Sequence, residues 1–237
     1  MSKPAFFQIA IDGPVAAGKG TVSRLVAQRL NFLYVDTGAM YRVTAFLALQ
    51  NSVEYSDTSA VVKIVKKTNI QMRNPSKDEA DGRLTTVLVN GEDVSWKIRT
   101  EAVGLGASVV AQIKEVREVL VEKQQQIARA QNVVMEGRDI TYRVLPDAQL
   151  KIYLTGRDFV RANRRHLQLQ SRGNDVSFNE VFIDLKERDH VDMNRATDPL
   201  QIVASAWVLD TSDLTIRQVV EIIVSKAQVM MQSNTQN

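Results

Sequence analysis

The fold of this chain is decided by the segment Gly13-Pro14-Val15-Ala16-Ala17-Gly18-Lys19-Gly20-Thr21. An apolar run from Phe6 to Ile11 precedes it and predicts a buried strand, and apolar residues at helical spacing follow it. A glycine-rich segment between a strand and a helix is typical of a phosphate-binding loop, because glycine lets the backbone wrap closely around a phosphate group. The loop N–H groups, the helix N-terminus and Lys19 would then face the anion together.

The alternative is a glycine-rich turn that only joins a strand to a helix, which the context on both sides disfavours. The general phosphate-loop motif has Ser or Thr directly after the lysine, whereas here Gly20 separates Lys19 from Thr21. We therefore predict no metal-binding residue and expect Mg²⁺ to be held mainly by nucleotide phosphates and water.

The composition is that of an ordinary globular protein. With 237 residues, of which 44% are hydrophobic, the chain is long enough for one main domain. Its net charge of +3 is too small for general attraction to nucleic acid or membranes, so we expect neither partner. The absence of cysteine excludes disulfides and thiolate metal sites. Gln8 and Asp12 interrupt the first apolar run, which is therefore neither a signal peptide nor a membrane span, and we expect a cytoplasmic location.

Short apolar runs that alternate with amphipathic stretches predict a parallel sheet covered by helices. Further strands of this sheet are expected at Phe32 to Val35, Val133 to Met135, Leu150 to Leu154 and Trp207 to Leu209.

Between about residues 68 and 98 the pattern changes and predicts an inserted β lobe. Strands are expected at Ile70 to Arg73 and at Leu84 to Val89, and Asn90-Gly91 is a strong hairpin signal. Further along, Ser177-Phe178-Asn179-Glu180 matches a capping box and predicts a helix that runs toward Asn194.

Two clusters of basic residues indicate an anionic partner. Arg188, Asp192 and Arg195 share one face of the helix after the capping box. The other cluster comprises Arg157, Arg161, Arg164 and Arg165. Like charges at helical spacing repel one another, and phosphates would relieve that repulsion. The alternative is a solvated face with intrahelical ion pairs, which is less favoured in a chain that also has a phosphate loop.

Two further segments follow predicted strands directly, at the edge where open α/β sheets bind ligands. They are Glu136-Gly137-Arg138-Asp139 and Asp36-Thr37-Gly38, the latter followed by Tyr41 and Arg42. Their alternative roles are a tight turn with a surface ion pair and a helix cap, respectively. Their location at the ends of strands favours a role in ligand binding over these alternatives.

Taken in order, these segments resemble the bacterial cytidylate kinases of the long form, from about Ala5 to Val229. The matching motifs are Ile11-Asp12-Gly13-Pro14, Ala17-Gly18-Lys19-Gly20-Thr21, Asp36-Thr37-Gly38-Ala39-Met40-Tyr41-Arg42, Gly137-Arg138-Asp139 and Lys186-Glu187-Arg188-Asp189 with Asp192 and Arg195. Agreement in order and spacing is more specific than any single motif. The chain departs from the family at Val15-Ala16 and at Thr141-Tyr142, where the family commonly has Gly-Thr after the equivalent of Ile140.

The resemblance implies a single domain over residues 1–237 with the α/β fold of the nucleoside monophosphate kinases. A five-stranded parallel core sheet flanked by helices would be built from residues 5–35, 100–155 and 176–229. Residues 36–99 would form the monophosphate-binding region with its small β insert, and residues 156–175 a mobile lid.

The resemblance also implies site residues by position. The catalytic set would be Lys19, Arg138, Arg188 and Arg195. ATP would be bound by the loop from Gly13 to Thr21 and by Arg157, Arg161 and Arg165. The acceptor phosphate would be held by Arg42, Arg138 and Arg195, and the ribose and its surroundings by Arg188 and Asp192. Thr37 would contact the acceptor nucleotide, and its base would be read by Ser108, Arg117 and Asp139.

The assignment of Arg117 and Asp139 to the base makes chemical sense. Cytosine presents an N4 amino donor beside N3 and O2 acceptors, which a carboxylate and an arginine can satisfy. The implied activity is direct in-line transfer of the γ-phosphoryl group of ATP, with Mg²⁺, to CMP or dCMP in pyrimidine nucleotide metabolism, by a monomer. Two rivals stay open: a small kinase with another acceptor, and a nucleotide-dependent switch. The chain has no Asn-Lys-x-Asp motif, which disfavours a GTPase, and only its pI of 9.1 supports nucleic-acid binding.

Overall fold

The computed structural model describes residues 4–79, 81–171 and 173–235. The ends of the expected single domain (residues 1–3 and 236–237), residue 80 of the expected insert and residue 172 of the expected lid lie outside the described residues. None of the described helices combines the length and hydropathy needed to cross a membrane.

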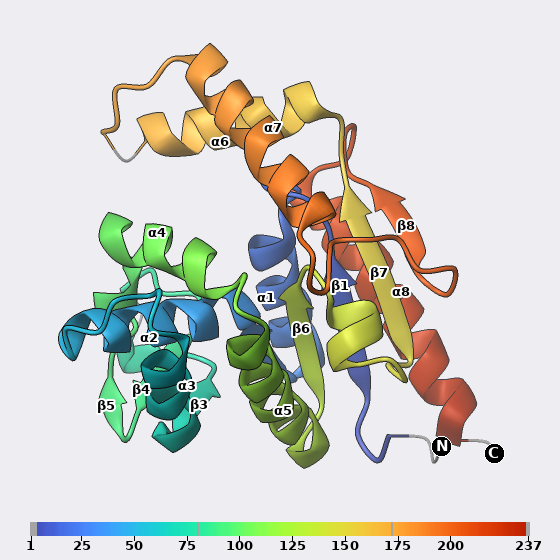
Figure 1. The fold of residues 1–237 in the computed structure, drawn as a ribbon. Helices are drawn as coiled ribbons and strands as arrows, with labels where there is room; N and C mark the ends of the chain where they lie inside the picture. The colour runs from blue at the N-terminus through green and yellow to red at the C-terminus, as the bar shows by residue number, and fades with distance from the viewer. Residues whose placement is uncertain (1–3, 80, 172, 236–237) are drawn as a thin grey trace.

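A five-stranded parallel sheet forms the centre of the molecule, with strand order β2-β6-β1-β7-β8 (Figure 1). The strands are β1 (Gln8–Asp12), β2 (Leu33–Asp36), β6 (Val133–Gly137), β7 (Leu150–Thr155) and β8 (Trp207–Asp210). They confirm the predicted strands, with ends shifted by one or two residues. Every residue of β1 is buried, because helices cover both faces of the sheet at this strand.

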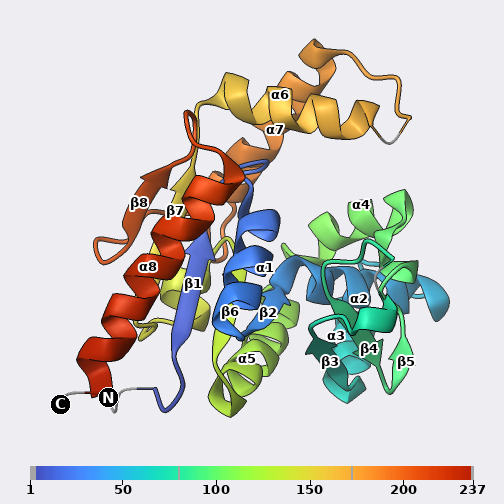
Figure 2. The ribbon, with the colours of Figure 1, turned by 180° about the vertical axis from the view of Figure 1, so that it is seen from behind.

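Alternating side chains of β1 meet different helices. Ile9 and Ile11 pack in one apolar cluster with α1 (Lys19–Leu30) and α8 (Ile216–Thr235), which lie side by side on one face of the sheet (Figure 2). Ala10 belongs to a second cluster, which includes the buried face of α5 (Lys114–Ala130) on the other side. The period of two along the strand therefore builds both layers of the core.

The predicted β insert is present as a three-stranded antiparallel sheet of β3 (Ile70–Arg73), β4 (Thr86–Val89) and β5 (Glu92–Asp93). Strand β4 begins at Thr86 and not at Leu84 as predicted. The hairpin signal is confirmed, because Asn90 and Gly91 have φ values of 51° and 90°, as a type I′ turn requires. Helices α2 (Thr37–Gln50), α3 (Thr58–Lys67) and α4 (Glu101–Val110) complete this part, with single 3₁₀ turns at Lys77–Glu79 and Lys97–Arg99.

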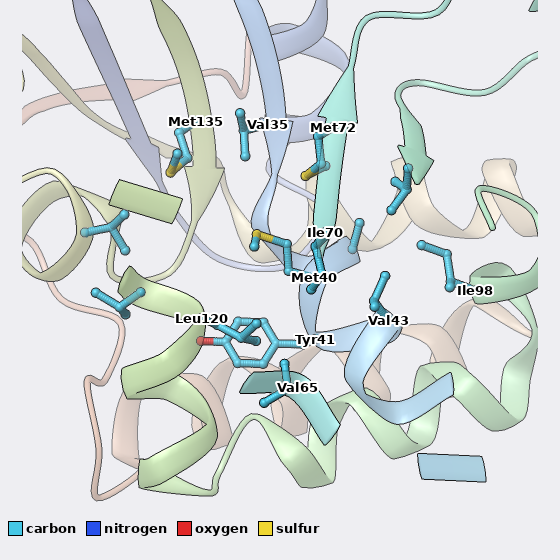
Figure 3. Close-up of a cluster of buried hydrophobic side chains, with 14 of the residues drawn as sticks. Val35, Met40, Tyr41, Val43, Val65, Ile70, Met72, Ile98, Leu120 and Met135 are labelled. Carbon is cyan, nitrogen blue, oxygen red and sulfur yellow. The ribbon is translucent and has the colours of Figure 1, made fainter. Parts of the chain in front are cut away.

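The insert shares its hydrophobic core with the central sheet (Figure 3). Met40 of α2 and Met72 of β3 lie in the same buried cluster as Val35 and Met135 of the central strands. The Asn74 side chain also bridges the two sheets, since its Oδ1 accepts from Tyr34 N at 3.0 Å and its Nδ2 donates to Phe32 O at 2.8 Å. This amide satisfies backbone groups at the open edge of β2.

Helices α6 (Asp158–Gln170) and α7 (Phe178–Asn194) pack on each other and project beyond the carboxyl ends of the strands (Figure 1). The predicted capping box is confirmed, because Ser177 and Glu180 exchange backbone and side-chain bonds at the start of α7. A small apolar cluster of Val15, Ala162 and Leu185 joins this pair to the glycine-rich loop. Between β6 and β7 the chain makes one π-helical turn, Ile140–Val144.

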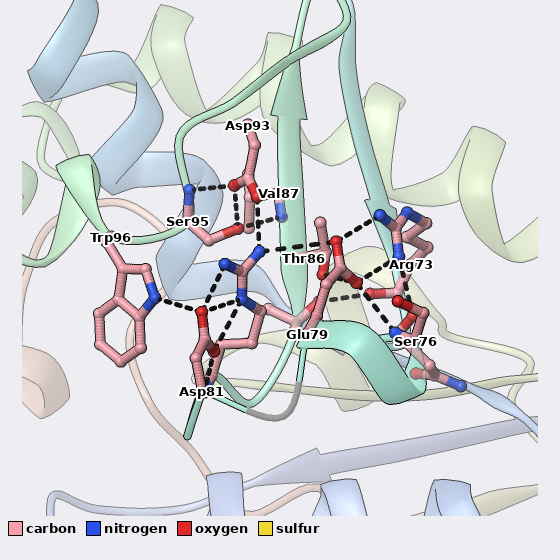
Figure 4. Close-up of polar contacts among 12 residues, drawn as sticks. Arg73, Ser76, Glu79, Asp81, Thr86, Val87, Asp93, Ser95 and Trp96 are labelled. Atoms are coloured by element: carbon pink, nitrogen blue, oxygen red, sulfur yellow. Dashed lines mark hydrogen bonds and ion pairs between the residues drawn. The ribbon is translucent and has the colours of Figure 1, made fainter.

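The polar surface of the insert is organised around Glu79 (Figure 4). Arg83 pairs with Glu79, Asp81 and Asp93 beside it. Glu79 accepts two bonds of 2.6 Å from the terminal nitrogens of Arg73, one of 2.9 Å from Ser76 N and one of 3.0 Å from Thr86 Oγ1. These hydrogen bonds favour the ionised carboxylate and lower the pKa of Glu79 from 4.5 to about 2, with Arg73 as the largest cause.

We therefore expect the Glu79 carboxyl to titrate near pH 2 when its carbon resonance is followed by NMR. Since the folded-state pKa lies below the unfolded one, its contribution to stability is complete above about pH 4.5 and is lost as the pH falls through 2. Arg73→Gln should raise this pKa, whereas Arg29→Gln, which removes another exposed arginine from an ion pair, should not. Titration of native Glu79 near pH 4.5 would show that its hydrogen bonds do not lower its pKa.

Candidate active site

A cleft of about 690 Å³ opens at the carboxyl end of the central sheet, between the glycine-rich loop, α2, α4 and α7. Most residues assigned from sequence line it: Ala16, Ala17, Gly18, Lys19, Gly20, Thr21, Thr37, Arg42, Ser108, Arg117, Arg138, Asp139, Arg165, Arg188, Asp192 and Arg195. Gly13, Pro14 and Val15 are not among the lining residues, and neither are Arg157 and Arg161. Tertiary structure thus gathers side chains from segments that are more than 150 residues apart.

The glycine-rich loop has a geometry that only glycine allows at its first position. A Cβ atom on Gly13 would lie 2.0 Å from the backbone oxygen of Leu154, so the loop runs directly against β7. Gly18, with φ of 90°, then turns the chain into α1. The N-terminus of α1 faces the cleft, since Gly18, Lys19 and Gly20 all line it.

Lys19 is buried and folds back onto its own loop. Its Nζ donates to the backbone oxygens of Gly13 and Pro14, both at 2.8 Å. Burial, and then the positive charge of Arg138, lower the pKa of Lys19 from 10.5 to about 7. The amine is therefore held by two carbonyl groups that a phosphate oxygen could replace.

The loop is also tied to the α6–α7 pair by Asp189, which sequence reasoning did not select as a site residue. Val15 N donates to Asp189 Oδ1 at 2.8 Å, and Arg161 donates from Nη1 to Asp189 Oδ2 and to Val15 O, both at 2.7 Å. Arg161 and Asp189 are both buried. The available signal for Asp189 was its position directly after Arg188 and close to Asp192, which were both selected as site residues. Its contact with Val15 spans 174 positions and leaves no local pattern in the sequence.

Asp12, at the end of β1, is fully buried and holds the turn that follows Arg138 and Asp139. Its carboxylate accepts from Ile140 N at 2.9 Å, from Thr141 N at 2.8 Å and from Thr141 Oγ1 at 2.7 Å. Burial raises the pKa of Asp12, and the bonds from Thr141 oppose that rise. The unusual Thr141 thus fastens the π-helical turn to β1, directly after Arg138 and Asp139.

Several arginines line the cleft. Arg138 donates from Nε to Asp192 Oδ2 at 2.5 Å, and this carboxylate raises the pKa of Arg138 against the effect of burial. Burial and then the charge of Arg99 lower the pKa of Arg42. Arg99, which sequence reasoning missed, lines the cleft and lies 3.2 Å from Asp36 Oδ2. The concentration of positive charge suits an anionic ligand.

Arg117 and Asp139, which both line the cleft, form a buried pair. Arg117 Nη2 donates to Asp139 Oδ2, and its guanidinium lies over the ring of Tyr41, 5.5 Å from the centroid. Burial raises the pKa of Asp139, and Arg117 opposes that rise. Ser108 lines the cleft nearby on α4. The pair offers N–H donors and a carboxylate acceptor side by side.

The prediction that the arginines at the start of α6 and along it repel one another is wrong. Arg157 pairs with Asp213, Arg161 pairs with Asp158 and Asp189, and Arg164 donates to Thr211 Oγ1 at 2.9 Å. Counter-charges and acceptors from other segments offset the repulsion that helical spacing alone predicted. Arg165 is the member of this cluster that lines the cleft.

Comparison with known proteins agrees with this geometry. The family model described as cytidylate kinase matches residues 9–229. A cytidylate kinase of Caldanaerobacter subterraneus subsp. tengcongensis is 45% identical over 90% of this chain and 91% of its own length. One from Caldicellulosiruptor bescii is 43% identical over 90% and 92%, respectively. A solved structure of an uncharacterised Eubacterium ventriosum protein has a similar fold, with a TM-score of 0.52 at 9% identity over 94% of this chain and 98% of its own. The chain therefore belongs to the cytidylate kinase family.

Proposed function

We propose that this protein transfers the γ-phosphoryl group of ATP to CMP or dCMP, giving ADP and CDP or dCDP. The observation that carries the proposal is that one cleft gathers three kinds of group: a phosphate loop with Lys19, several arginines, and the Arg117–Asp139 pair. A donor triphosphate on the loop and an acceptor monophosphate under the arginines would meet in line.

Lys19 and the loop would bind the β- and γ-phosphates of ATP. The two carbonyl groups that hold the amine would give way to phosphate oxygens, and the anionic charge would raise the pKa of Lys19 again. The amine would then stay protonated while negative charge spreads over the transferred group.

The acceptor phosphate would be held by Arg42, Arg138 and Arg195, with Arg188 and Asp192 near the ribose and Thr37 near the nucleotide. Asp192 orients Arg138 through the bond of 2.5 Å from its Nε, which supports this arrangement. Arginine is suited to the task, because its planar fork can bind two phosphate oxygens at once. Arg138, Arg188 and Arg195 would also stabilise the transferred group.

Mg²⁺ would be held mainly by phosphate oxygens and water and would neutralise charge on the phosphates. The carboxylates of Asp36 and Glu136 lie on neighbouring strands at the wall of the cleft and could accept bonds from its waters. Burial, and then the charge of Asp36, raise the pKa of Glu136, so a nearby cation would favour the ionised pair.

Residues 156–175 would act as a lid that brings Arg165 toward ATP and excludes water, with Arg157 and Arg161 at its base. Gly156 and Gly173 are candidate hinges, and a Cβ on Gly173, whose φ is 79°, would meet no neighbour within 4 Å. Exclusion of water suppresses hydrolysis of ATP, which every kinase must avoid.

The function itself is tested by a coupled assay for ADP release with CMP, dCMP, UMP, AMP and GMP as acceptors. The proposal expects ADP release that depends on CMP or dCMP. Equal release with every acceptor would favour a kinase of different specificity, and slow release without any acceptor would favour a nucleotide-dependent switch.

The first prediction from this assignment is that Lys19→Ala lowers the turnover number by several powers of ten, because one transition-state cation is lost. The melting temperature should not fall, since burial of the wild-type ammonium group is itself unfavourable. Lys226→Ala is the matched control, since Lys226 lies over Trp207 and does not line the cleft. Near-normal turnover of Lys19→Ala at saturating ATP would rule out the loop assignment.

The second prediction is that amide hydrogen exchange in residues 156–175 slows when a bisubstrate analogue is bound. Ligand phosphates would bind Arg165, which already lines the cleft, and order the segment. Helix α8 contributes no residue to the lining of the cleft, so it provides an internal control that should exchange at the same rate in both states. Equal protection of residues 156–175 with and without analogue would show that no lid closes.

The third prediction is that CMP exceeds UMP as acceptor by about a hundredfold or more in kcat/KM. Uracil has an O4 acceptor where cytosine has its N4 donor, and it carries a proton on N3, so Asp139 and Arg117 both lose a partner. Each buried group left unpaired costs about 1–3 kcal/mol.

Asp139→Asn should narrow this ratio, because an amide can turn its NH₂ group toward O4. The measurement is kcat/KM for CMP and UMP in both proteins. Equal use of both acceptors by the wild type would refute the base-site assignment, and an unchanged ratio in the variant would show that Asp139 does not read the base.

A further inference from the structure

A second carboxylate holds Arg117, and it comes from a segment to which no role has been assigned. Arg117 Nε donates to Asp198 Oδ2 at 3.0 Å, while Nη2 donates to Asp139 and Nη1 to Ala111 O at 3.2 Å. Arg117 is only 1% exposed, so these partners are the environment that replaces water around its charge.

Asp198 also contacts Arg195, one of the three arginines proposed for the acceptor phosphate. Its backbone oxygen accepts from Arg195 Nε at 2.8 Å and from Arg195 Nη2. The residue has a φ of 47°, a left-handed conformation that is uncommon for a residue with a Cβ atom. One residue therefore binds Arg117 through its side chain and Arg195 through its backbone, and it needs an unusual backbone conformation to do so.

The departure of this chain from the family pattern supplies the groups that hold Asp198 in place. Tyr142 donates from its hydroxyl to Pro199 O at 2.6 Å, and Arg143 Nε lies 3.6 Å from Asp198 Oδ1. On the other side, Leu200 N donates to Asp192 O at 2.7 Å. Residues 142 and 143 thus fasten the segment that carries Asp198 to the π-helical turn, and the backbone bond from Leu200 fastens it to the end of α7.

The donor count shows what Asp198 does for Arg117. A guanidinium has five N–H groups, and the contacts to Asp198, Asp139 and Ala111 use three of them among the described residues. The remaining two lie one on each terminal nitrogen, and the proposed function pairs them with the O2 and N3 atoms of cytosine. Occupation of Nε by Asp198 fixes the rotation of the guanidinium and keeps this pair of donors available.

We infer that Asp198 is a positioning residue for the acceptor base, which orients Arg117 and couples it to Arg195, with Tyr142 holding its segment. The inference rests on the proposed function. Asp198 itself touches neither the base nor the transferred group, because it acts through the two arginines. Its removal should therefore alter acceptor recognition and leave the ATP side of the cleft unchanged.

The test compares Asp198→Ala, Asp198→Asn and Tyr142→Phe with the wild type in steady-state kinetics and in calorimetric titration with CMP. Asp198→Ala leaves Nε of Arg117 buried without a partner, so KM and Kd for CMP should rise about tenfold to a hundredfold. The ratio of kcat/KM for CMP over UMP should fall, while KM for ATP and kcat stay within about twofold. Asp198→Asn keeps an oxygen acceptor and should be affected less, and Tyr142→Phe should shift CMP affinity in the same direction by a smaller factor.

Glu221→Gln is the control. It breaks the ion pair between Glu221 and Arg29, neither of which lines the cleft, and should change none of these constants. An unchanged Kd for CMP in Asp198→Ala would overturn the inference. Parallel losses for CMP and ATP would also overturn it, since they indicate a general structural role. If Asp198→Ala fails to fold, the Asn and Phe variants decide by the same criteria. A wild type that binds CMP without phosphorylating it would refute the proposed function alone, whereas one that binds no CMP would refute both.

Discussion

The cleft gathers several positive charges beside a phosphate loop, and the pairing of these charges supports both the site and the fold. Each buried cation in the cleft needs an acceptor while no phosphate is bound, because an unpaired charge away from water is strongly unfavourable. Lys19 has the backbone oxygens of its own loop, and Arg117 has Asp139 and Asp198. Arg138, which is half-buried, has Asp192. Some of these partners occupy positions that nucleotide groups would take. The others orient the arginines toward the nucleotide.

The same pairings hold the architecture together. Asp189 binds both the backbone of the loop and Arg161, and so connects the loop to the α6–α7 pair. Asp12 binds the π-helical turn after β6, which directs Arg138 and Asp139 into the cleft. Removal of one partner from such a buried pair is costly because the other charge stays buried. Site and fold therefore depend on the same carboxylates.

Local signals account for the parts of the structure that the sequence predicted well. The Asn90-Gly91 turn, the Ser177–Glu180 capping box and the buried strands each depend on residues within a few positions of one another. The same holds for the phosphate loop, which is recognisable because its glycines, lysine, strand and helix are adjacent. Most proposed site residues lie at the ends of such elements, and ordered motifs therefore located them.

Local patterns along the chain were enough to predict the order of its elements, the parallel core with its β insert, and the residue types available for phosphate and cytosine. Which charges are paired depends on the folded chain. The arginines of α6 seemed to repel one another because their acceptors, such as Asp213 and Thr211, lie about fifty positions away. Asp198 stayed unnoticed for the same reason, since its contact with Arg117 spans 81 positions. Side-chain pairing depends on distance in space, which sequence spacing reports only within a single helix, strand or turn.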